Sequence, residues 1–126
     1  MTATDHAVEL VVTAARAASD KLAQQIIAFD VSEQLAITDA FLLASATNDR
    51  QVRAIVDEVE DKLREIGAKP VRREGERDGR WVLIDYAEIV VHVQHTEERE
   101  FYALERLWRD CPVIAMPADV SSGRGR

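Results

Sequence analysis

The stretch WVLIDYAEIVVHV at positions 81–93 holds the residues best suited to chemistry. Asp85 and Glu88 are carboxylates near His92 in the sequence, and a carboxylate beside an imidazole can work as an acid–base pair. A strand histidine more often hydrogen-bonds to a neighbour without reacting. Trp81 is in the same stretch, and proton transfer does not require it. The pattern therefore leaves catalysis, core packing and partner contact open.

Other reactive side chains lack suitable neighbours. Cys111 is the only cysteine, which excludes an internal disulfide and a cysteine-cluster metal site. It precedes Pro112 with no histidine nearby in sequence, so we interpret it as an unreactive thiol. His92 and His95 fall on opposite faces of a strand and suit no single metal centre. Phosphate-binding glycine motifs and a G-x-S-x-G elbow are absent, and we expect no cofactor and no metal.

Charge also limits the possible partners. Between positions 72 and 80, four arginines alternate with three acidic residues, which favours a solvated, salt-bridged loop over a phosphate site. The net charge of −7 argues against DNA binding and favours basic protein partners. No apolar run reaches eighteen residues, and the first residues do not resemble a secretory signal. We therefore expect a cytoplasmic protein without a membrane span.

Apolar periodicity predicts three helices. The first covers 5–23, and the second has an apolar stripe over 52–66 that ends before Gly67. The third starts at Thr96 as its N-cap and ends at Pro112. These helices must position the stretch at 81–93.

A short apolar run that is β-branched at both ends predicts a strand at 26–31, and further strands are predicted at 41–46 and around 69–74. A strand, a helix and a further strand suggest a right-handed crossover. The polar, glycine-containing end at 118–126 is predicted to be a disordered tail, which leaves one domain over 1–117.

Residues 81–93 are predicted to form a hairpin with its turn at 86–87. This register sets Asp85 opposite Glu88 and Trp81 opposite His92, and opposed residues share a face. One face is then wholly apolar: Val82, Ile84, Ile89, Val91 and Val93. The other face is mixed: Trp81, Leu83, Asp85, Glu88, Val90 and His92.

The apolar face of the hairpin belongs on the core. The mixed face is harder to interpret, because a solvated face usually lacks tryptophan and a buried face usually lacks a carboxylate pair. A surface that a partner covers fits this mixture. A face covered by one of the protein's own helices, with only its rim in water, fits equally well. Both interpretations stay open.

Three segments together resemble the ribosomal silencing factor family, also called Iojap: TDAFLLASATNDRQVRAI, REGERDGRWVLIDYAEIVVHV and REFYALERLW. The match runs in order from about the first helix to Trp108. Alanine stands at positions 46 and 87, where the family usually has glycine, and Ala40 replaces its usual tyrosine. At Ala87 the turn must avoid positive φ or accept strain.

The resemblance implies an α/β fold with a single mixed five-stranded sheet flanked by helices, similar to nucleotidyltransferases. It also implies a translational repressor without cofactor or turnover. Such a factor binds the large ribosomal subunit at protein fourteen and blocks joining of the small subunit when nutrients are scarce. A metal-dependent nucleotidyltransferase-like enzyme is the alternative, but the chain lacks the Gly-Ser pair and the Asp-x-Asp that this chemistry needs.

The resemblance further implies that the mixed hairpin face docks on the ribosomal protein. Trp81 is then the apolar anchor, and His92 hydrogen-bonds at the rim. A free homodimer is expected to cover the same face. The partner-binding residues expected on this basis are Trp81, Leu83, Asp85, Tyr86, Glu88 and His92, with the two carboxylates meeting basic groups and Tyr86 exposed at the elbow.

Overall fold

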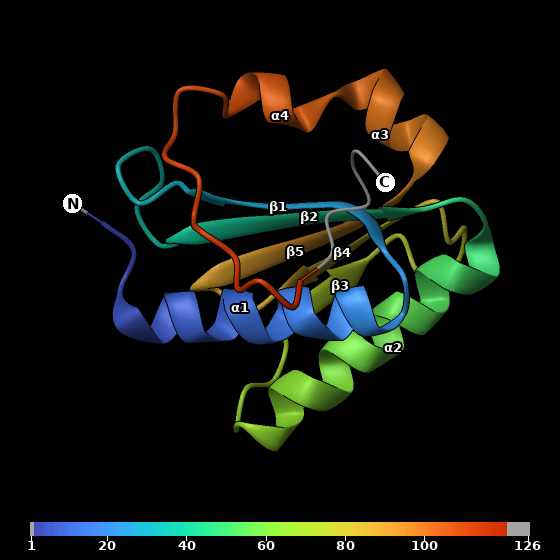
Figure 1. The fold of residues 1–126 in the computed structure, drawn as a ribbon, viewed down its shortest axis with the longest axis horizontal. Helices are drawn as coiled ribbons and strands as arrows, with labels where there is room; N and C mark the ends of the chain where they lie inside the picture. Colours follow the sequence, from blue (N-terminus) through green and yellow to red (C-terminus); the bar gives the residue numbers. More distant parts are fainter. Residues whose placement is uncertain (1, 121–126) are drawn as a thin grey trace.

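A computed structural model describes residues 2–120. It contains one mixed sheet with α1 and α2 on one face and α3 and α4 on the other (Figure 1). The elements in chain order are α1 (Asp5–Asp20), β1 (Gln24–Asp30), β2 (Ala40–Ala46), α2 (Asp49–Glu65), β3 (Arg72–Glu74), β4 (Trp81–Asp85), β5 (Ile89–His95), α3 (Thr96–Tyr102) and α4 (Leu104–Leu107).

The strand order in the sheet is β1-β2-β5-β4-β3. β2 and β5 are parallel, and the other neighbouring pairs are antiparallel. Helix α2 therefore carries the chain from β2 to the far edge, with β5 and β4 between β2 and β3. The predicted mixed five-stranded sheet flanked by helices is confirmed, whereas the likeness to nucleotidyltransferases stays a prediction.

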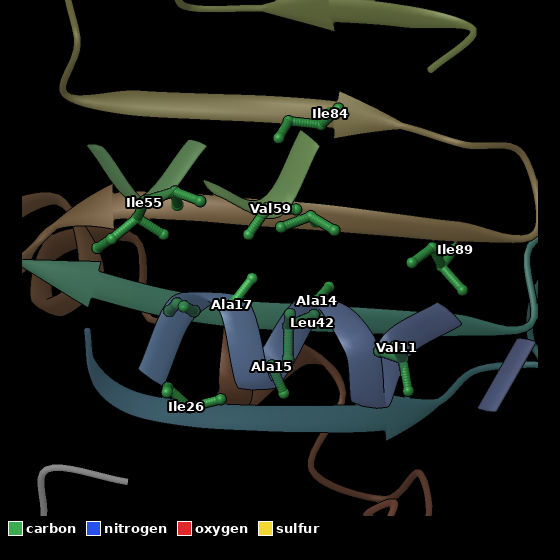
Figure 2. Close-up of a cluster of buried hydrophobic side chains, with 14 of the residues drawn as sticks. Val11, Ala14, Ala15, Ala17, Ile26, Leu42, Ile55, Val59, Ile84 and Ile89 are labelled. Atoms are coloured by element: carbon green, nitrogen blue, oxygen red, sulfur yellow. The ribbon is translucent and has the colours of Figure 1, made fainter. Parts of the chain in front are cut away.

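The main core lies between the sheet and helices α1 and α2. Small residues such as Ala14 and Ala17 let α1 approach the strands closely, and Ile55 and Val59 of α2 fill the space toward Ile84 (Figure 2). The predicted stripe of α2 is buried, except that Ile66 lies just beyond the helix and is exposed. Burial of this amphipathic face, at about 25 cal/mol per Å² of apolar surface, provides much of the helix's stability.

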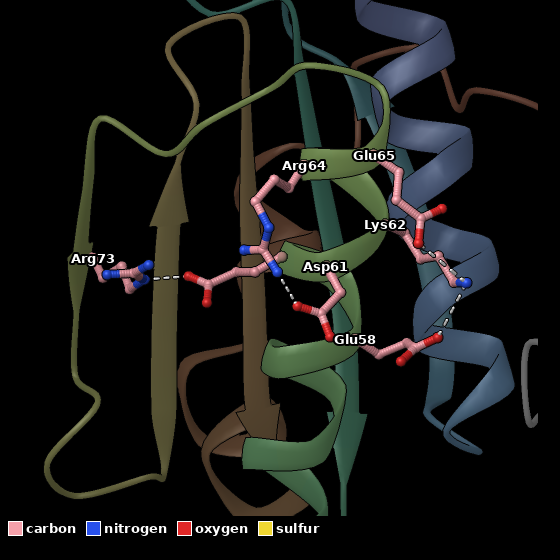
Figure 3. Close-up of polar contacts among 7 residues, drawn as sticks. Glu58, Asp61, Lys62, Arg64, Glu65 and Arg73 are labelled. Atoms are coloured by element: carbon pink, nitrogen blue, oxygen red, sulfur yellow. Dashed lines mark hydrogen bonds and ion pairs between the residues drawn. The ribbon is translucent and has the colours of Figure 1, made fainter.

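Ion pairs lie along α2, and one of them joins the helix to the edge strand β3 (Figure 3). Glu58 and Lys62, one turn apart, pair within the helix at 3.8 Å. Glu60 does not pair with Arg64, although Arg64 also lies one turn away. Glu60 instead reaches across to Arg73 of β3, because its side chain points toward the sheet edge rather than along the helix. The short strand β3 is thus tied to the helix layer.

The single helix predicted after β5 is two short helices. Ala103 separates them in the left-handed conformation, with φ 46°. The N-cap of α3 is His95 and not Thr96, because His95 Nδ1 accepts a hydrogen bond from the Glu97 backbone N–H at 3.1 Å. A non-glycine residue in this conformation costs about 1 kcal/mol, so the change in direction between α3 and α4 is made against local preference.

The C-terminal segment runs along the β1 edge. The Ile114 backbone N–H donates to the Ala28 carbonyl at 2.9 Å. Asp119 pairs with Arg16 of α1 at 3.0 Å, and Val120 packs against the core. Residues 118–120, predicted to begin a disordered tail, make these contacts instead, and 121–126 lie outside the described residues. Among residues 2–120, no helix is both long and apolar enough to cross a membrane.

Candidate functional site

The hairpin of β4 and β5 has a register shifted by two residues from the prediction. Asp85 lies opposite Val90 and Trp81 opposite Gln94, because the turn is centred one residue later than predicted, with residues 86–88 between the strands. Side chains alternate along a strand, so an even shift leaves each strand residue on its predicted face. The predicted faces are therefore correct for the strand residues, although the predicted pairs are wrong.

The hairpin loop fixes the position of Asp85. Its Oδ1 accepts the Ala87 backbone N–H at 2.8 Å, and its Oδ2 lies 3.3 Å from Arg72 Nε on β3. Ala87 has φ 69°. The turn thus accepts the strain that a glycine would avoid. The Asp85 carboxylate supports this turn and the edge strand, and it stays partly exposed at the margin of the mixed face.

Two predicted contact residues, Tyr86 and Glu88, do not lie on the mixed face in the structure. Glu88 lies in the loop, and its carboxylate is 2.8 Å from His6 Nδ1 on α1. Tyr86 continues the alternation of Val82 and Ile84, so its ring is buried on the α1–α2 side. Burial raises the pKa of Tyr86 to about 12. The expectation of an exposed Tyr86 at the elbow is therefore wrong.

Trp81 is held in place by His92. The indole Nε1–H donates to His92 Nδ1 at 3.1 Å, and the imidazole also makes an edge contact with Phe41. His92 is only 6% exposed, so its predicted position at the rim is wrong. Burial lowers its pKa from 6.5 to about 4, and the neutral ring then carries its proton on Nε2. His92 supports Trp81 from beneath.

Helices α3 and α4 add exposed apolar side chains, although their helical spacing in the sequence is typical of core residues. The ring of Tyr102 lies 4.8 Å from that of Trp81 and 4.9 Å from that of Phe101. Phe101 is 79% exposed and Leu107 is 72% exposed. The segment FYALERLW was the available signal, but helical spacing of apolar residues usually indicates core. We define the contact surface as Trp81, Leu83, Phe101, Tyr102 and Leu107.

A groove of about 340 Å³ lies beside the contact surface, between the hairpin and α4. Leu83 and Val90 line it on the sheet side, and Leu104, Leu107 and Trp108 line it on the helix side. The interpretation that the protein's own helices cover this face thus holds in part, whereas covering by a partner stays a prediction. The protein's own helices cover Val90 and His92, whereas Trp81 and Leu83 remain half-exposed.

The arrangement suits recognition better than catalysis. Asp85 and Glu88 face different partners, Arg72 and His6, and do not converge on one point. Residues 2–120 contain no group of three or more His, Cys, Asp or Glu side chains that could hold a metal ion. Cys111 is buried, and burial raises the pKa of its thiol, which makes it less nucleophilic at neutral pH.

The family model and the relatives that match this chain carry the same family name. Residues 4–125 match the family model described as ribosomal silencing factor during starvation. Two relatives named ribosomal silencing factor are similar to the chain: one from Halalkalibacterium halodurans, 39% identical over 90% of this chain and 97% of its own, and one from Bacillus subtilis, 42% identical over 79% and 85%.

A crystal structure from Chromobacterium violaceum has a TM-score of 0.78 and 30% identity, and the match covers 91% of this chain and 95% of that chain. A more distant mouse relative, 29% identical over 68% of this chain, is named mitochondrial assembly of ribosomal large subunit protein 1. This chain covers 39% of that protein's length. With a family model that matches almost the whole length, the chain belongs to the ribosomal silencing factor family.

Proposed function

We propose that the protein is a translational repressor that binds the large ribosomal subunit through ribosomal protein fourteen. It blocks joining of the small subunit and lowers translation when nutrients are limiting. The observation that carries the proposal is an exposed aromatic contact surface on a chain of the silencing factor family. The name of the mouse relative supports the large subunit as the target. The protein acts in the cytoplasm, where its ribosomes translate.

The mechanism is steric and requires neither a cofactor nor turnover. Interface energy concentrates in a few aromatic anchors, and Trp81 is the best placed of these. Its indole is oriented by the hydrogen bond to His92 and by the ring of Tyr102. An anchor that is ordered before binding loses little entropy on docking. The rest of the domain then occupies space that the small subunit needs.

Charge supports a basic partner. The net charge of −7 attracts basic proteins over distances of about 8 Å at physiological salt. Asp85 lies at the margin of the contact surface, and Glu88 at the hairpin end is 42% exposed. Both carboxylates are available to basic groups at the rim. Tyr86 takes no part in docking, because it is buried in the core.

The free protein is proposed to be a homodimer through the same contact surface. Trp81, Leu83 and Leu107 form an apolar patch when nothing covers them, and such patches favour association. The dimer must then dissociate before the ribosome can bind. Light scattering at micromolar concentration should give twice the monomer mass, and a monomer throughout would contradict this proposal.

Co-sedimentation with separated ribosomal subunits tests the proposed function. The chain should sediment with large subunits and not with small ones. Trp81→Ala should weaken binding by about 2 kcal/mol, which is roughly thirtyfold. The matched control is Leu22→Ala, a 77% exposed leucine away from the contact surface, which should bind unchanged. Equal binding of both variants would contradict the proposal, and nucleotide transfer dependent on added Mg²⁺ would favour the enzyme alternative.

A further inference from the structure

The two faces of the sheet differ in the polar groups that they bury. The core beneath α1 and α2 is a continuous cluster of apolar residues, with the Tyr86 hydroxyl as a buried polar atom that has no partner among the described residues. On the other face, Ser45, His92, Gln94 and Arg99 are all buried. A polar group in the interior costs free energy unless it is hydrogen-bonded. Each of these side chains therefore needs a partner.

Arg99 and Ser45 have such partners. The Arg99 guanidinium donates to the Gln25 carbonyl and to Glu105, at 2.7 Å in both cases. Ser45 Oγ donates to the Gln24 carbonyl at 3.0 Å. These bonds join α3 to β1 and β2, so the polar layer is partly used to hold the helices against the sheet.

Gln94 and His92 are different. Gln94 is 0% exposed, and neither its Nε2 nor its Oε1 hydrogen-bonds to any described residue. His92 Nε2, which carries the ring proton, has no partner among these residues either. The NH2 group and the carbonyl of Gln94 and the ring N–H of His92 thus lie buried and unpaired on one strand face. Leaving such groups unpaired is expensive, and in native proteins it often has a functional reason.

The segment over these groups is held mainly by polar contacts, those of Arg99 and the ion pairs of Arg80 with Glu97 and Glu98, and it buries little apolar surface. We call α3 and α4, residues 96–107, the cover. Arg99 is the only buried residue of α3, and α4 has none. Leu104 is partly buried against the smaller cluster around Phe29 and Leu43. Ala103 breaks the cover in the left-handed conformation. Segments with few buried apolar contacts open locally at low cost.

We propose that the cover moves aside on binding and carries Phe101, Tyr102 and Leu107 with it, while the hydrogen bond to His92 keeps the Trp81 indole in place. Gln94 and His92 Nε2 then hydrogen-bond to an extended polypeptide segment of the partner. Gln94 is fully buried, so no partner can reach it unless the cover moves. The two residues are i and i+2 on one strand, about 6.7 Å apart along it, and an extended peptide repeats its outward groups at the same spacing. A segment lying over β5 can thus offer a carbonyl and an N–H to both. The inference rests on the proposed function, which supplies a ribosomal protein as the partner.

Gln94→Met tests this inference, with Gln51→Met as the matched control. Gln51 Nε2 donates to the carbonyls of Lys21 and Leu22, at 3.1 and 3.2 Å. Removing an unpaired amide should raise the melting temperature by about 3 °C, and removing a paired one should lower it by about 3 °C. Gln94→Met should also weaken co-sedimentation with large subunits about fivefold or more, while Gln51→Met should bind as the wild type does.

Two results on these variants would overturn the inference. One is a melting temperature lowered by Gln94→Met as much as by Gln51→Met, and the other is unchanged binding of Gln94→Met. Hydrogen exchange of the free protein provides an independent readout. Amides of 97–107 should exchange by local opening, well before those of α2. Exchange of the cover only through global unfolding would also overturn the inference. If wild-type protein sediments with neither subunit, the proposed function fails and the partner assignment with it, whereas melting and exchange still decide whether the cover opens.

Discussion

The two faces of the sheet differ in role, although the same strands contribute side chains to both. On the α1–α2 face, Val82 and Ile84 are buried in an apolar core. On the other face, Trp81 and Leu83 from the same strand remain half-exposed beside two short helices. Because alternate residues point to opposite faces, one strand can serve stability and recognition together. Neighbouring substitutions should therefore have different consequences.

The largest expected effect is from Val82→Asp. Val82 is 1% exposed, and a carboxylate there has no partner in the apolar core. The loss of unfolding free energy should be about 4 kcal/mol or more, enough to unfold much of the protein. Circular dichroism melting should show no cooperative transition near that of the wild type. Trp81→Ala, one residue away, should keep a cooperative transition, and an equal collapse of both variants would make Trp81 a core residue.

The mixed face should also make stability sensitive to pH. The folded-state pKa of His92 is about 4, below the ordinary 6.5, so the unfolded chain binds this proton more readily. Its contribution is complete above pH 6.5 and is lost as the pH falls toward 4. The loss should reach about 2 kcal/mol at pH 5, measured by urea unfolding. His92→Gln should remove this part of the dependence, and identical pH profiles for both proteins would contradict the assignment.

The strained loop between the two strands offers a smaller effect of opposite sign. Ala87→Gly should stabilise the protein by about 1 kcal/mol, because glycine adopts positive φ without a Cβ clash. Ala54→Gly in the middle of α2 is the control and should destabilise by about 1 kcal/mol. Both changes add one glycine to the unfolded chain, so the opposite signs isolate the turn conformation. Denaturant midpoints that fall for both would contradict the account of the loop.

The smallest effect concerns charge at the margin of the contact surface. Asp85→Asn keeps an oxygen acceptor for the Ala87 N–H and removes the negative charge. Binding to the large subunit should weaken by about 0.5 kcal/mol at low salt, and the difference should shrink as salt is added. Titration at two salt concentrations provides the comparison. A loss independent of salt would indicate a contact that does not depend on charge.

Much of the core face was predictable from the sequence. The stripe of α2 and the alternation of β4 each repeat at the period of their element, and burial followed that pattern, whereas β5 is buried on both faces. The hairpin register was not predictable, because moving the turn by one residue preserves the same faces. The burial of Tyr86 was not predicted for the same reason, since the position of the turn decides where the alternation of the strand ends.

The contact surface was only partly predictable. Trp81 and Leu83 followed from strand alternation, but Phe101 and Leu107 resemble core residues in sequence, because their helical spacing is the ordinary sign of a buried stripe. The break at Ala103 has no signal in residue type, since this conformation usually takes glycine. The burial of Gln94 without a partner follows from tertiary packing alone.

Ribosome assembly in a sucrose gradient tests the central claim most directly. Purified large and small subunits are mixed under joining conditions with wild-type protein, with Trp81→Ala or with the exposed control Leu22→Ala. The account predicts that saturating wild-type and control protein reduce the peak of joined ribosomes, whereas Trp81→Ala at the same concentration reduces it much less. An undiminished joined peak at saturating wild-type protein would contradict the account.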